Sequence, residues 1–134
     1  MENTRSFSIN LVGDSTQEKY TGTFKVKCLL GPLERFRADE IRRELLGSNA
    51  KEASSLVHDM AIIFSELSLR IIDGPIWWFS NPQGTYPGIH IKDQNVWESV
   101  FSEAVKMESQ YKQEIREKAD KAKEELTKDA SPSA

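Results

Sequence analysis

The sequence predicts an α+β fold in which an N-terminal antiparallel β-hairpin is followed by three helices, the last long and charged at its C-terminal end. Two runs of alternating apolar and polar residues near the N-terminus predict the hairpin. Apolar residues at a 3.6-residue period after residue 32, and again after residue 95, predict the helices. The 134 residues suffice for one core. We expect a single domain over residues 1–112 and a charged helical extension with a frayed tail over residues 113–134.

The predicted hairpin has one apolar face. Its inward positions are Phe7, Ile9 and Leu11 in the first strand, and Tyr20, Gly22, Phe24, Val26 and Cys28 in the second. Gly22 at an inward position indicates a close approach of another part of the chain. A two-stranded hairpin alone is marginal in water, so it needs helices beneath it, another strand or a partner subunit.

The first helix is predicted to begin at Pro32 and to end before Gly47, a C-terminal cap. Its apolar stripe is expected to contain Leu33, Phe36, Ile41 and Leu45. For the second helix, Asn49 and Glu52 have the spacing of a capping box. The second helix is expected to be central and buried on most sides, because its apolar stripe is wide: Ala53, Leu56, Val57, Met60, Ala61, Ile62, Ile63, Phe64, Leu67, Leu69 and Ile71.

The third helix is predicted to be capped by Asp93 or Asn95. Its apolar face runs through Val96, Trp97, Val100, Phe101, Ala104, Met107 and Tyr111. Beyond that point the apolar residues thin to Ile115, Ala119, Ala122 and Leu126, among charges at i, i+4 spacing. This end is either a solvated extension or a helix that orders against a partner groove.

Residues 73–92 are too long for an ordinary loop and too aromatic for a disordered segment. We expect one of Trp77 and Trp78 to close the ends of the second and third helices, and the other to face a partner. Aromatic residues are enriched where interfaces concentrate their binding energy. The predicted partner-binding residues are Trp77, Trp78, Phe79, Tyr86, Tyr111 and Ile115.

The composition argues against several classes of partner. The net charge of −3 disfavours binding to a nucleic-acid backbone, and acidic residues are interleaved with the arginines of residues 35–43. The single Cys28 cannot form an internal disulfide, which favours a reducing compartment. No leader-like segment and no run of about 18 apolar residues occurs. We therefore expect a cytosolic protein that binds neither nucleic acid nor membrane.

Nothing in the sequence predicts catalysis, a cofactor or a metal. His58 and His90 are far apart, and no paired cysteines or histidine-carboxylate cluster occurs. Cys28 occupies an inward strand position, where it is expected to be a small buried apolar residue rather than a nucleophile. We expect a protein that is not an enzyme.

Four segments carry a resemblance to a known family: FSINLVGDSTQEKYTGTFKVKCLL, IRRELLG, SELSLRIIDGPIWW and KDQNVWESVF. Over residues 6–108 the order of elements resembles the tail assembly chaperones of tailed bacteriophages. The resemblance implies a non-enzymatic protein of the host cytoplasm that coats the helical tape-measure protein while tail-tube subunits polymerise, and then leaves. We also expect the protein to self-associate, because the hairpin lacks support in the sequence and the last helix extends past its apolar face. The alternative is a structural virion subunit, a tail or head accessory protein that contacts other virion proteins and remains in the particle.

Overall fold

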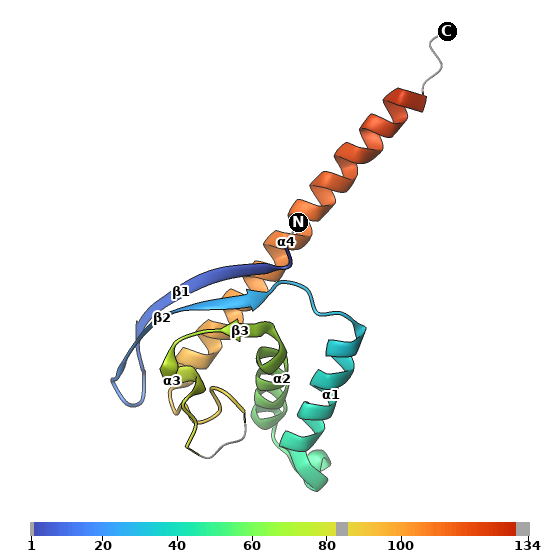
Figure 1. Ribbon diagram of the computed structural model, residues 1–134. Helices are drawn as coiled ribbons and strands as arrows, with labels where there is room; N and C mark the ends of the chain where they lie inside the picture. The colour runs from blue at the N-terminus through green and yellow to red at the C-terminus, as the bar shows by residue number, and fades with distance from the viewer. Residues whose placement is uncertain (1, 83–85, 131–134) are drawn as a thin grey trace.

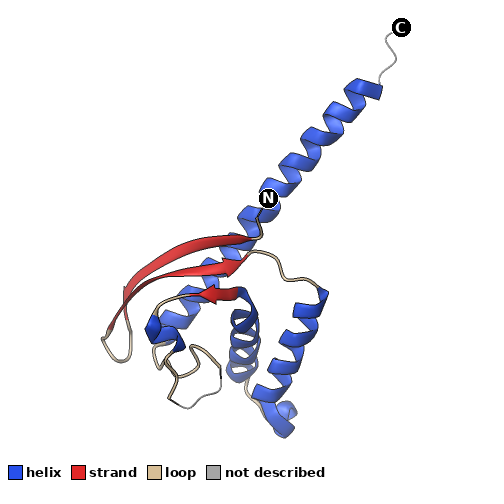
Figure 2. Ribbon diagram, viewed as in Figure 1, coloured by secondary structure: helices blue, strands red, loops and turns tan. Residues whose placement is uncertain are grey.

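The computed structural model describes residues 2–82 and 86–130 and confirms the predicted α+β fold. An antiparallel sheet of strand order β1-β2-β3 packs against α2 and α4, and α1 lies outside α2 (Figure 1, Figure 2). The elements in chain order are β1 (Thr4–Val12), β2 (Lys19–Lys27), α1 (Pro32–Leu46), the 3₁₀ helix η1 (Gly47–Glu52), α2 (Ser55–Arg70), β3 (Ile71–Asp73), α3 (Ile76–Phe79) and α4 (Gln94–Ala130).

The hairpin forms in the register that its alternation predicts. Phe7 pairs with Phe24, and their rings stack with centroids 5.3 Å apart. Gly22 allows the predicted close approach, because a Cβ there would lie 2.7 Å from the Cβ of Pro75. The core lies between this face of the sheet and the helices, and it consists of Phe7, Ile9, Tyr20, Phe24, Val26, Phe64, Leu67, Trp78, Ile91, Val96, Trp97, Val100 and Ala104.

A third strand stabilises the hairpin, which would be marginal in water as two strands alone. β3 pairs antiparallel with β2, where Ile71 lies opposite Val26. The assignment of Ile71 to the second helix was therefore wrong. Ile71 has an extended backbone (φ −79°, ψ 116°), so α2 ends at Arg70 and the chain turns directly into the sheet.

Helix α1 has the predicted bounds but buries a different face. Pro32 is its first residue and Gly47, with φ 70°, ends it. Leu33 and Phe36 are 84% and 69% exposed, whereas Ala38 and Ile41 are buried. Because successive residues are about 100° apart, these two pairs lie on opposite sides of the helix. The predicted stripe was wrong in its first half, since α1 packs mainly on α2 and only one narrow side is covered.

Helix α2 starts later than predicted. The Oγ atom of Ser54 accepts a hydrogen bond from the Val57 amide at 3.2 Å, which makes Ser54 the N-cap. Asn49 and Glu52 lie in η1 instead, so the predicted capping box was wrong. Phe64 and Leu67 are buried in the core, as expected of a central helix.

The residues predicted to cap α4 hold the β1–β2 loop instead. The buried Asp93 carboxylate accepts hydrogen bonds from the Ser15 and Thr16 amides at 2.8 and 2.7 Å, and from the Thr16 hydroxyl at 2.6 Å. The Asn95 side chain accepts from the Asp14 amide and donates to the Val12 carbonyl. The N-cap site of α4 is thus the point where the hairpin is tied to the helix.

The second half of α4 leaves the domain. The helix continues without a break past residue 112 and extends beyond the sheet (Figure 1). Up to residue 127, Tyr111 is its last buried residue, and the Arg5 guanidinium of β1 lies 5.8 Å above its ring. Arg5 also forms an ion pair with Glu114. From residue 115 to residue 127 the side chains are exposed.

Candidate functional site

The aromatic segment folds against its own sheet. The buried Trp78 lies edge-on to Phe24 of β2 and stacks with Phe64 in the middle of α2. Trp77 is half-buried; it contacts Tyr20 and Phe24, and its Nε1 donates to the Thr21 carbonyl at 3.0 Å. Both indoles therefore pack on β2. Trp78 seals the helical core, as expected of one of the two, but it does so beside the middle of α2 and not at the helix ends.

The structure does not bring the six predicted partner-binding residues together. Trp78 and Tyr111 are buried and present no surface to a partner, and Trp77 presents only part of its indole. Tyr86 is half-buried and its hydroxyl donates to Glu44 of α1. The remaining two, Phe79 on α3 and Ile115 on the outer part of α4, are exposed but lie on separate elements.

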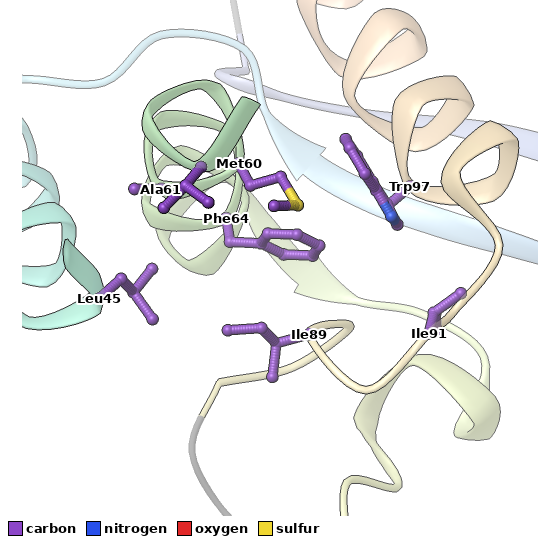
Figure 3. Close-up of a pocket in the computed structure, with 8 residues that line it drawn as sticks. Leu45, Met60, Ala61, Phe64, Ile89, Ile91 and Trp97 are labelled. Atoms are coloured by element: carbon purple, nitrogen blue, oxygen red, sulfur yellow. The ribbon is translucent and has the colours of Figure 1, made fainter. Parts of the chain in front are cut away.

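An apolar groove that the sequence did not predict lies between α2 and the start of α4. Its first pocket has a volume of about 310 Å³ and is lined by Leu45, Val57, Met60, Ala61, Phe64, Ile89, Ile91 and Trp97. Figure 3 shows Met60 and Phe64 projecting from α2, with Trp97 across from them and Ile89 and Ile91 along one side. The second pocket, of about 270 Å³, is lined by Leu56, Asp59, Ile62, Ile63, Trp97, Glu98 and Phe101. Trp97 belongs to both pockets, and we call the pair the α2–α4 groove.

The groove exposes apolar residues that were expected in the core. Leu56, Val57 and Ile62 are 48%, 38% and 43% exposed, so the prediction that α2 is buried on most sides was wrong for its first two turns. A wide apolar stripe has the same pattern whether a neighbouring element covers it or not. The feature of the sequence that could have indicated the groove is the width of the apolar stripe of α2. Ile62 lies outside the part of the helix surface that a single neighbouring layer would bury.

The rim of the groove is acidic. Asp59 and Glu98 line the second pocket beside Ile62 and Phe101. Within residues 2–82 and 86–130, neither carboxylate forms an ion pair, although Glu98 accepts a hydrogen bond from the Gln94 side chain at 2.6 Å. An apolar floor with an acidic edge suits a ligand that is apolar along one side and basic beside it.

A buried arginine sets the geometry of the two helices that form the groove. Arg70, at the end of α2, is fully enclosed and donates to the carbonyl of Cys28, directly after β2, at 3.1 Å. Its Nη2 also donates to Glu66 of α2 at 3.0 Å and to Glu108 of α4 at 3.2 Å. These contacts join the C-terminal end of α2 to the chain after β2 and to α4.

The groups weighed for chemistry are engaged in the fold. Cys28 is buried, and burial raises the pKa of its thiol. His58 Nε2 lies 2.8 Å from the Ala50 carbonyl, and His90 Nε2 lies 2.9 Å from the Trp77 carbonyl. In the described part of the chain no group of three or more histidine, cysteine or carboxylate residues could hold a metal ion, and no helix there has both the length and the apolar character to cross a membrane.

The arginines of α1 pair with nearby acids. Arg37 pairs with Glu40, and both Arg42 and Arg43 pair with Asp39 on the same helix. The hydrogen bond from Arg42 is the main cause that lowers the pKa of the Asp39 carboxyl. The helix thus has the mixed-charge surface that its interleaved sequence predicts.

Comparison of the chain with protein-family models, curated proteins and solved structures gives no significant match.

Proposed function

We propose that this protein is a non-enzymatic tail assembly chaperone of a bacteriophage, which binds amphipathic helices of the tape-measure protein in the α2–α4 groove. The α2–α4 groove is the observation that carries the proposal. Exposed single apolar side chains are ordinary, but a contiguous apolar surface with a polar rim is typical of an interaction site. Here Leu56, Val57 and Ile62 extend such a surface over the first two turns of α2.

The shape and chemistry of the groove favour a helix as the client. An amphipathic helix binds by placing apolar residues at i, i+3 or i+4 and i+7 into a groove. The two pockets on either side of Trp97 provide room for two such anchors. Asp59 and Glu98 favour clients with basic residues beside the apolar stripe.

Co-expression with a tape-measure protein tests the proposal. The wild-type chain is expected to keep that client soluble, and Val57→Lys is expected to abolish the effect by placing a charge in the first pocket. Leu33→Lys is the matched control, because Leu33 is an equally apolar and more exposed residue on α1, outside the groove. A client whose solubility is the same with and without the wild-type chain would refute the proposal.

The alternative is a structural virion subunit. The outer part of α4, which stands clear of the domain, favours it because such a helix can join neighbouring subunits in a particle. Mass spectrometry of purified particles separates the two functions. A chaperone is expected to be absent from finished particles, whereas a virion subunit is present in a fixed ratio to the other components.

A further inference from the structure

We propose that the outer part of α4 in one copy of this chain, residues 112–127, binds in the α2–α4 groove of a second copy. The same chain carries an apolar groove without an occupant and a helical segment without a covering element. The proposal does not rest on the proposed function, because it concerns the protein in the absence of any client.

The outer part of α4 has the pattern of a groove-binding helix. Ile115 and Leu126 are 38% and 68% exposed, with Ala119 and Ala122 between them. At about 100° per residue, these four side chains lie within about 60° of one another along one side of the helix. Ile115 and Leu126 supply larger apolar side chains at the two ends of the stripe, and the alanines between them allow the helix backbone to come close to the groove.

The charges beside this stripe are mainly basic. Within about 80° of the stripe centre, helical geometry places three lysines and no acid: Lys112, Lys118 and Lys123. Glu117 and Glu124 lie on the opposite side of the helix, where they do not face a groove that holds the stripe.

The basic borders of the stripe complement the acidic rim of the groove. Asp59 and Glu98 stand on α2 and α4, one on each of the two helices that form the second pocket. Lys118 and Lys123 lie on opposite borders of the stripe, so a seated helix has a lysine for each wall. Such complementarity orients the helix and selects this occupant over helices with acidic borders.

The outer part of α4 reaches a groove only on a second copy. Trp97, Glu98 and Phe101, at the start of α4, form one wall of the groove. The outer part of the same continuous helix runs away from that wall (Figure 1). A chain can therefore reach its own groove only by breaking α4. The contact joins two different surfaces, so it produces either a closed ring or pair or an extending array of copies.

Complementary variants of the full chain test this contact by light scattering or analytical ultracentrifugation without a client. The helix variant carries Ile115→Lys and Leu126→Lys, and the groove variant carries Leu56→Lys and Val57→Lys; all four side chains are exposed in the monomer. Each variant alone is expected to be monomeric at concentrations where the wild type associates, with a loss of affinity of at least about tenfold. Circular dichroism confirms that each remains folded.

Mixing the two variants gives the decisive result. The helix variant keeps an intact groove, and the groove variant keeps an intact helix. One copy of each is therefore expected to form a dimer that cannot grow further. Leu33→Lys is the control and is expected to associate as the wild type does. A wild type that stays monomeric, a helix variant that keeps the wild-type mass, or a mixture that stays monomeric would each overturn the proposal.

A charge exchange tests the pairing of charges between the helix and the groove. Asp59→Lys plus Glu98→Lys in the helix variant, which supplies the groove, is expected to weaken the mixed dimer, and Lys118→Glu plus Lys123→Glu in the groove variant is expected to restore it. Failure to restore it would overturn the proposed pairing of charges.

Discussion

Tyr20 and Asp93, 73 residues apart in the chain, are joined by a buried hydrogen bond of 2.8 Å from the phenol to the carboxylate. Tyr20 belongs to β2, and Asp93 precedes the first turn of α4. Thr16 and Ser15 donate to the same carboxylate. The hairpin is thereby attached to the helix that forms one wall of the α2–α4 groove.

The Asp93 carboxylate is expected to make the fold sensitive to acid. Burial opposes its ionisation, but the hydrogen bonds from Thr16, Tyr20 and Ser15 prevail and lower its pKa from 3.8 to about 2. A lowered pKa in the folded state contributes stability above about pH 4, and this contribution is lost as the pH falls from about 4 to about 2. Urea unfolding across this range measures the loss.

Asp93→Asn is the control for the acid prediction. The amide does not titrate, so this variant is expected to be less stable at neutral pH and to show a weaker dependence on pH below about 4. If the free energy of unfolding of the variant falls with decreasing pH as steeply as that of the wild type, other carboxylates cause the acid sensitivity.

Tyr20 is expected to make the fold sensitive to alkali. Burial and the hydrogen bond to Asp93 raise the pKa of its phenol from 10.0 to about 12. A raised pKa contributes stability below about pH 10, and this contribution is lost between about pH 10 and 12. Tyr20→Phe is expected to remove this part of the alkaline transition, measured by urea unfolding as a function of pH. An unchanged transition in the variant would contradict the assignment.

Arg70→Ala is expected to lower the free energy of unfolding by about 3 kcal/mol. The substitution leaves the Cys28 carbonyl and the Glu66 and Glu108 carboxylates without their shared buried donor. Arg35→Ala is the matched control, because Arg35 approaches the same two carboxylates at 3.5 and 3.6 Å from an exposed position. Its cost is expected to stay below about 1 kcal/mol. Equal costs in chemical denaturation would mean that burial of the arginine is unimportant.

Gly88→Ala is expected to displace Trp78. Gly88 has φ 82°, and an added Cβ would lie 2.4 Å from the indole ring. Gly47→Ala is the control, since Gly47 also has a positive φ, 70°, but has no atom near its Cβ position. The control is expected to cost about 1 kcal/mol from backbone strain alone. Only Gly88→Ala is expected to shift the tryptophan fluorescence to longer wavelength; an equal shift in both would indicate a backbone effect.

Sequence patterns correctly predicted those features that depend on residues close together in the chain. Alternation determines which residues of a hairpin share a face, and it correctly predicted that Phe7 and Phe24 face the core. Proline at the first helical position and a glycine of positive φ at the end set the bounds of α1, because both act on the backbone of their own turn.

The candidate site could not be predicted in the same way. The six aromatic and apolar residues proposed for partner binding were chosen by residue type, yet Trp78 and Tyr111 proved to be buried. The groove instead uses Leu56, Val57 and Ile62, which have the same apolar character as the core residues of α2. Which of them meets water depends on the elements that pack around the helix.

The amino-acid order thus decided the hairpin, its inward face and the approximate extents of the helices, because each depends on residues close in the chain. Only the packing of distant segments decided the rest. Ile71 turns into a third strand, Trp78 packs edge-on against Phe24, and Asp93 forms hydrogen bonds with the β1–β2 loop. Each of these contacts requires a partner many residues away in the chain. The open groove has the same origin: α2 has more apolar surface than α1, α4 and the sheet together cover.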